Sequence, residues 1–105
     1  MSTVAIAGSE VAVNDEGFMT NPEQWTPEIA AEIAREDGIP VLTDAHWKVI
    51  DFCREDGKDS GISPTLRQIS KGTGVTTKEI FKLFPKGPAK KIAKISGLGK
   101  PEGCV

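Results

Sequence analysis

Helix-start and helix-stop signals recur along this chain and leave room only for short helices. A threonine or serine marks four expected starts, at residues 26, 43, 63 and 76, and Pro88 marks a fifth. Such hydroxyls accept hydrogen bonds from the free amides of a first helical turn, and proline fits the first helical position. Glycine or proline closes most of these segments. The pattern predicts a bundle of short helices.

The N-terminal segment has a different pattern. Residues 3–14 hold two short β-prone runs around Gly8-Ser9, and Asp15-Glu16-Gly17 is a turn signal. A hairpin alone is marginal in water, so this one must pack on the helices that follow. We therefore predict a mainly α (α+β) fold: a small N-terminal β-hairpin, an orthogonal helical bundle with a helix-turn-helix-like segment over 66–84, and a flexible C-terminal arm.

The first two helices show clear apolar faces. Ile29, Ile33 and Ala34 share one face of the helix that Thr26-Pro27 begins. Thr43 is expected to cap the second helix, on which Cys53 continues the apolar face and is read as a buried small hydrophobe. His46 has no His, Cys or acid at metal-ligand spacing. We predict neither a metal site nor a cofactor.

The length of the chain limits the functions it can have. The chain has 105 residues, 38% of them apolar and 27% charged, which fits one small domain. We place it at residues 1–96, followed by an arm at 97–105. A domain of this size suits a carrier or adaptor better than a self-contained enzyme. No apolar run is long enough to span a membrane, and the start does not resemble a signal peptide, so we expect a cytoplasmic protein without structural disulfides.

Charge is distributed unevenly. Residues 1–55 carry 11 acidic and 3 basic side chains, whereas residues 56–105 carry 4 acidic and 10 basic ones. A positive face of this kind suits an acidic protein partner or the phosphates of a nucleic acid. It is equally consistent with lysines that only solvate helix surfaces. Composition does not choose among the three.

The C-terminal tail carries the main chemical candidate, Cys104. Gly97, Gly99 and Gly103 leave the backbone permissive and Pro101 stops a helix, so the tail is predicted to be a mobile arm. A cysteine at its tip has little to pack against, and a thiolate is a nucleophile. Lys100 would favour the thiolate, whereas Glu102 and the C-terminal carboxylate would disfavour it. The alternative interpretation is an incidental cysteine on a frayed end.

Several segments together resemble a known family. They are Asn14-Asp15-Glu16-Gly17-Phe18, His46-Trp47, Ser63-Pro64-Thr65-Leu66-Arg67, Leu83-Phe84-Pro85-Lys86-Gly87-Pro88 and the tail from Ile95 to Val105. The pattern is similar to that of the DsrC/TusE family over nearly the whole chain. The resemblance implies a small helical protein that carries sulfur as a persulfide on Cys104, with Lys100 and Arg67 as candidate helpers of the thiolate.

The resemblance also implies partners and shows departures. A TusBCD-like or DsrEFH-like complex would donate sulfur, and a tRNA thiolase or a dissimilatory sulfite reductase would accept it. Ala93 stands where DsrC proteins have a second arm cysteine, so we predict relay by a single cysteine. Gly99 replaces a proline usual in the family, and we expect this to loosen the arm.

Two other functions remain open. One is a sulfur-responsive regulator that binds nucleic acid, even weakly, through residues 66–84; against it, Lys78, Glu79 and Lys82 are the only polar contacts that its second helix offers. The other is an accessory, gamma-type protein of a sulfite reductase that carries no sulfur.

Overall fold

An antiparallel hairpin forms the N-terminal end of the protein. The computed structural model describes residues 2–101, and in it β1 (Ser2–Ile6) pairs with β2 (Ser9–Val13). The connecting residues Ala7 and Gly8 both have positive φ, 51° and 81°. Two such residues in a row match the twist of the flanking strands, as two-residue hairpin turns require. The predicted hairpin is confirmed.

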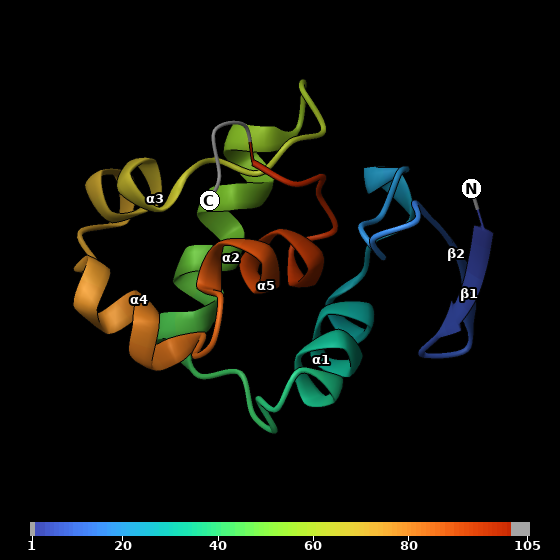
Figure 1. Ribbon diagram of the computed structural model, residues 1–105, viewed down its shortest axis with the longest axis horizontal. Coiled ribbons are helices and arrows are strands. Elements are labelled where there is room, and N and C mark those ends of the chain that lie inside the picture. Colours follow the sequence, from blue (N-terminus) through green and yellow to red (C-terminus); the bar gives the residue numbers. More distant parts are fainter. Residues whose placement is uncertain (1, 102–105) are drawn as a thin grey trace.

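Within residues 2–101, five α-helices follow a short 3-10 turn. The turn is η1 (Pro22–Gln24), and the helices are α1 (Pro27–Glu36), α2 (Asp44–Gly57), α3 (Leu66–Thr73), α4 (Thr77–Leu83) and α5 (Pro88–Ile95). In Figure 1 the hairpin lies at one end of the molecule, α3 and α4 lie at the other, and α2 and α5 run between them. The predicted α+β class is confirmed. Within residues 2–101, every helix is too short or too polar to cross a membrane.

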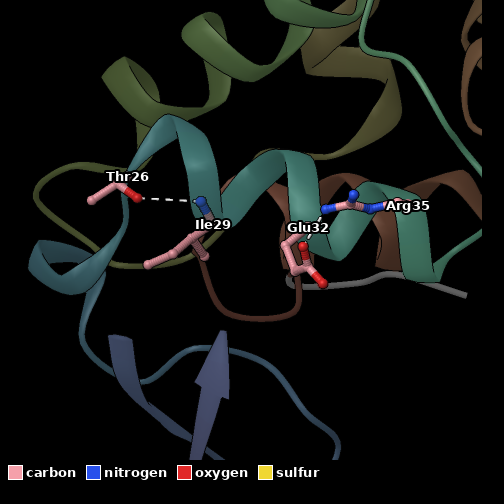
Figure 2. Close-up of polar contacts among 4 residues, drawn as sticks. All are labelled: Thr26, Ile29, Glu32 and Arg35. Atoms are coloured by element: carbon pink, nitrogen blue, oxygen red, sulfur yellow. Dashed lines mark hydrogen bonds and ion pairs between the residues drawn. The ribbon is translucent and has the colours of Figure 1, made fainter. Parts of the chain in front are cut away.

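Threonine caps begin three of the helices as predicted. The Thr26 hydroxyl accepts a hydrogen bond of 3.2 Å from the amide of Ile29. Figure 2 shows this contact, with Glu32 and Arg35 paired farther along α1. Thr76 accepts in the same way from the amide of Glu79, at 3.1 Å. Thr43 caps α2 through a reciprocal contact with His46. These local bonds satisfy amides that a helix start leaves free, which explains why they are visible in the sequence.

The predicted start of α3 at Ser63-Pro64 is wrong. The helix begins at Leu66, because Thr65 is the better cap: its hydroxyl accepts from the amide of Gln68, and the Gln68 side chain accepts from the amide of Thr65 at 2.8 Å. Such a reciprocal box satisfies two amides at once. Ser63 has a different role, since its amide donates to the carbonyl of Gly99 at 3.0 Å.

Two apolar clusters stabilise the fold. The smaller joins the hairpin to α1 and includes Val11, Met19 and Ile29. The larger fills the space among the five helices and includes Ile50, Cys53 and Phe84. Trp25 and Ile33 contact both clusters and so connect them. The hairpin is therefore supported by helix packing, as its marginal stability alone requires.

Candidate functional site

The C-terminal arm starts from a fixed base. We call residues 97–101 the arm base. The amide of Gly99 donates to the carbonyl of Gly61 at 2.8 Å, and the carbonyl of Gly99 accepts from the amide of Ser63 at 3.0 Å. These two bonds form a parallel bridge between Ile62 and Gly99. The arm base is thus held by the backbone of the loop that connects α2 to α3.

Packing adds to these hydrogen bonds. Leu98 is fully buried and Pro101 is buried as well. Gly97 has a φ of +71°, and a Cβ there would lie 2.5 Å from Cδ1 of Trp25. Glycine is therefore required at residue 97 by both backbone conformation and space. The chain can pass Trp25 this closely only without a side chain.

Trp25 and Arg54 bind backbone carbonyls immediately before the arm base. The sequence analysis did not connect either side chain with the arm. The indole Nε1 of Trp25 donates to the carbonyl of Ile95 at 2.8 Å. The guanidinium of Arg54 lies 4.3 Å from the centre of the Trp25 ring and donates to the carbonyl of Ser96 at 3.1 Å and of Pro22 at 3.2 Å. Partial burial lowers the pKa of Arg54. The end of α5 is thereby tied to the segment before α1.

These contacts correct two expectations about the arm. Gly97 and Gly99 were predicted to give flexibility, but both lie in packed, hydrogen-bonded positions. Gly99 was expected to loosen the arm in place of proline, yet its N–H makes a bond that proline, lacking that donor, cannot make. The mobility of the arm stays a prediction. Gly103 and Cys104 lie outside the described residues.

The two predicted helper residues lie on different elements, and their action on Cys104 stays a prediction. Lys100 is exposed, and its Nζ lies 3.9 Å from a carboxylate oxygen of Glu16, in the turn after the hairpin. Arg67 is exposed on the first turn of α3 and forms no ion pair within residues 2–101. An exposed pair at 3.9 Å contributes little to stability. Lys100 therefore remains available to a charged partner.

The second thiol, Cys53, is chemically inert in this fold. It is fully buried on α2, as predicted. Burial raises the pKa of Cys53 from 9.0 to about 12. Because the thiolate is the reactive form, Cys53 is not a nucleophile at neutral pH.

His46 has a structural role. Its Nδ1 accepts from the amide of Thr43 at 3.0 Å, and its Nε2 donates to the carbonyl of Leu83 at 2.8 Å. Both ring nitrogens are thus occupied, and the ring ties the start of α2 to the end of α4. Within the described part of the chain, no group of three or more His, Cys, Asp or Glu side chains is placed to hold a metal ion.

Comparison with known proteins agrees with the sequence resemblance. The family model described as "DsrC like protein" matches residues 5–105. This chain belongs to the DsrC family. The gamma subunit of dissimilatory-type sulfite reductase from Nitratidesulfovibrio vulgaris is 39% identical over 105 residues, with all of both chains covered. Sulfurtransferase TusE from Sodalis glossinidius is 38% identical, covering 93% of this chain and 96% of the relative.

Solved structures show the same fold. A crystal structure titled dissimilatory sulfite reductase I superposes with a TM-score of 0.85 at 41% identity, covering 99% of this chain and 100% of the other. The DsrC protein of Allochromatium vinosum gives a TM-score of 0.81 at 36% identity, covering 98% of this chain and 97% of the other.

In the present chain, Ala93 is fully buried in α5, four residues before the arm base.

Proposed function

We propose that this protein is a sulfur-relay carrier that accepts and delivers persulfide sulfur on Cys104. The observation that supports this most directly is the contrast between the two thiols of the chain. Burial excludes Cys53 from chemistry at neutral pH. Cys104 comes three residues after Pro101, the last described residue of the arm base, so a fixed base precedes the only other thiol. Family membership and the sulfurtransferase TusE relatives point in the same direction.

The proposed chemistry needs no external oxidant or reductant. The Cys104 thiolate attacks the outer sulfur of a donor cysteine persulfide. The sulfur–sulfur bond of the donor breaks, the donor cysteine leaves as a thiolate, and Cys104 becomes the persulfide. In delivery, a nucleophile of the acceptor attacks the outer sulfur and Cys104 leaves as the thiolate. Each step is a thiol–disulfide type exchange, whose rate depends on access and on the thiolate fraction.

We further propose the setting of this relay. A TusBCD-like or DsrEFH-like complex is the expected donor, in the cytoplasm. A tRNA thiolase or a sulfite reductase is the expected acceptor, and the carrier itself is a sulfurtransferase-type intermediary. The fixed base supports this role because it holds residues 97–101 in one place while the thiol is presented to two partners in turn.

Transfer of labelled sulfur tests the proposal. Wild type, Cys104→Ser and Cys53→Ala are each mixed with a sulfurtransferase charged with ³⁵S persulfide, and then with candidate acceptors. Wild type and Cys53→Ala should accept label in an amount equal to the protein and pass it on, whereas Cys104→Ser should accept none. Label on Cys104→Ser would contradict the assignment of Cys104 as the carrier. So would a wild-type protein that takes no label from either a TusBCD-like or a DsrEFH-like donor.

An accessory role is the second candidate, and the full-length match to a sulfite reductase gamma subunit favours it. An accessory subunit would assemble with a sulfite reductase without loading sulfur. Copurification of Cys104→Ser in a stoichiometric complex, together with the absence of label from wild type, would establish this alternative in place of the carrier.

A further inference from the structure

The segment that forms α3, α4 and α5 is strongly basic. Residues 66–94 contain eight basic side chains and one acidic side chain, Glu79. Six of the basic ones are exposed: Arg67, Lys71, Lys78, Lys82, Lys86 and Lys90. None of the eight forms an ion pair within residues 2–101. The fold therefore concentrates positive charge here without neutralising it.

An apolar pocket lies among these three helices. It has a volume of about 350 Å³ and is lined by Leu66, Phe81, Gly87, Pro88, Ala89 and Lys90. Phe81 is the exposed aromatic of the described chain, with 51% of its surface accessible. The pocket also lies at the start of α5, where Gly87 provides no side-chain cap and the helix dipole is positive. We call this pocket and the six exposed basic residues the basic pocket surface.

We propose that the basic pocket surface docks an acidic segment of a relay partner protein, which inserts an apolar side chain beside Phe81. This inference rests on the proposed carrier function and names the chemistry of its partner. An apolar anchor in a pocket supplies most of the affinity of such an interface. Lys90 lines the pocket, and three further unpaired basic residues directly adjoin lining residues in the chain: Arg67, Lys82 and Lys86. Such charges attract an acidic partner and accelerate its approach.

A protein partner explains these features better than a nucleic acid does. The exposed basic residues would suit phosphates, as would Lys90 and the start of α5 at the pocket. Most of the pocket lining is apolar, however, and suits an apolar side chain of a protein: Leu66, Phe81, Pro88 and Ala89. On α4 the polar side chains near Phe81 are Lys78, Glu79 and Lys82, without the Arg, Asn or Gln that reads base edges. The apolar lining therefore favours a protein partner.

The position of the surface fits delivery to the arm. Leu66, which lines the pocket, begins α3 only three residues after Ser63, whose amide binds Gly99. In Figure 1 the loop that holds the arm base leads directly into α3. A partner held on the basic pocket surface would thus contact the helix that directly follows the loop holding the arm base.

The test separates docking from chemistry. The variant Phe81→Ala/Lys90→Glu removes the anchor contact and reverses one charge of the pocket. Val41→Ala/Arg35→Glu is the matched control, because Val41 is 68% exposed and Arg35 is exposed, and neither lines the pocket. Loading of Cys104 is timed with persulfide-charged TusBCD-type and DsrEFH-type complexes, and separately with inorganic tetrasulfide, which needs no docking. Tetrasulfide gives up one sulfur to the thiolate and leaves as trisulfide.

The Phe81→Ala/Lys90→Glu variant should lose about tenfold or more in the loading rate from the protein donor that serves wild type. Tetrasulfide should load it at the wild-type rate, and the control should match wild type with both reagents. The docking proposal would be overturned if protein donors loaded this variant at a rate within twofold of wild type. It would also be overturned if wild type were loaded no faster by a protein donor than by tetrasulfide at the same concentration of transferable sulfur. Failure of tetrasulfide to load wild type would instead overturn the carrier function. Loss of tRNA or DNA binding, with protein transfer intact, would assign the surface to nucleic acid.

Discussion

The arm base and the basic pocket surface differ in burial and in charge within one small domain. Most of the arm base is buried, and neutral main-chain groups hold it, with Gly99 bonded to Gly61 and Ser63. The basic pocket surface is exposed, and its charged side chains have no ion-pair partner among residues 2–101. Buried hydrogen bonds fix a position because breaking them leaves unsatisfied groups. Exposed charges contribute little to stability but remain free for a partner.

This contrast separates positioning from recognition. Changes at the arm base should therefore alter stability and local order, whereas changes on the basic pocket surface should alter partner transfer alone. The predictions below would break the comparison if the two regions responded alike.

Gly97→Ala should have the largest effect on stability. The new Cβ would lie 2.5 Å and 2.9 Å from atoms of Trp25, at a φ of +71°. Strain and overpacking together should lower the free energy of unfolding by about 2–4 kcal/mol, measured by urea denaturation. Gly38→Ala is the matched control, because its φ is +89° but nothing lies within 4 Å of the new Cβ. A loss no larger than that of the control would show that Trp25 does not confine the arm base.

Alkaline pH should weaken the fold through Cys53. The thiol is neutral in both states below its ordinary pKa of 9.0; above it the unfolded chain ionises, while the folded thiol stays neutral up to about 12. The unfolded state then binds fewer protons, so stability falls as pH rises between these values, by up to about 1.4 kcal/mol per pH unit. Cys53→Ala should show a shallower fall in unfolding experiments over that range. Equal slopes would mean that Cys53 is not desolvated.

Gly99→Pro should loosen the bridge at the arm base. Proline removes the N–H that donates to Gly61, a loss of about 1 kcal/mol, and the amide of Ser63 should exchange its hydrogen about fivefold faster. Gly99→Ala keeps the N–H and places a Cβ 3.3 Å from the Gly61 carbonyl, so it should exchange more nearly like wild type. Faster exchange in the alanine variant than in the proline variant would assign the effect to crowding.

Lys90→Glu should have the smallest effect on stability. Lys90 is exposed in the first turn of α5, where an acidic side chain suits the helix dipole. The free energy of unfolding should change by less than about 0.5 kcal/mol. A larger loss in thermal or urea unfolding would mean that the basic pocket surface also supports the fold.

Local signals made much of this fold predictable. The hairpin turn and the caps at Thr26, Thr43 and Thr76 satisfy amides within a few residues, so the sequence alone shows them. The start of α3 was mispredicted because Ser63-Pro64 has the same local pattern as a true cap. Ser63 instead pairs with Gly99, a contact that no local rule reveals.

The support of the arm base could not be predicted for the same reason. Trp25 and Arg54 bind backbone carbonyls that lie 70 and 42 residues away in the chain. A carbonyl has no sequence signature, and neither does the amide of Gly99. The only signal in the sequence was Gly97, which was interpreted as a source of flexibility. A glycine that is needed because a tryptophan packs against it cannot be distinguished, from sequence, from a glycine in a flexible segment.

One mass measurement tests the carrier function most directly. Reduced wild-type protein is mixed with a persulfide-charged sulfurtransferase, and its intact mass and its peptides are read before and after treatment with a reductant. We expect the mass of one added sulfur atom, located on Cys104 and lost on reduction, with the Cys53 peptide unchanged. Sulfur on Cys53, or no addition from donors that load other carriers, would contradict the carrier function.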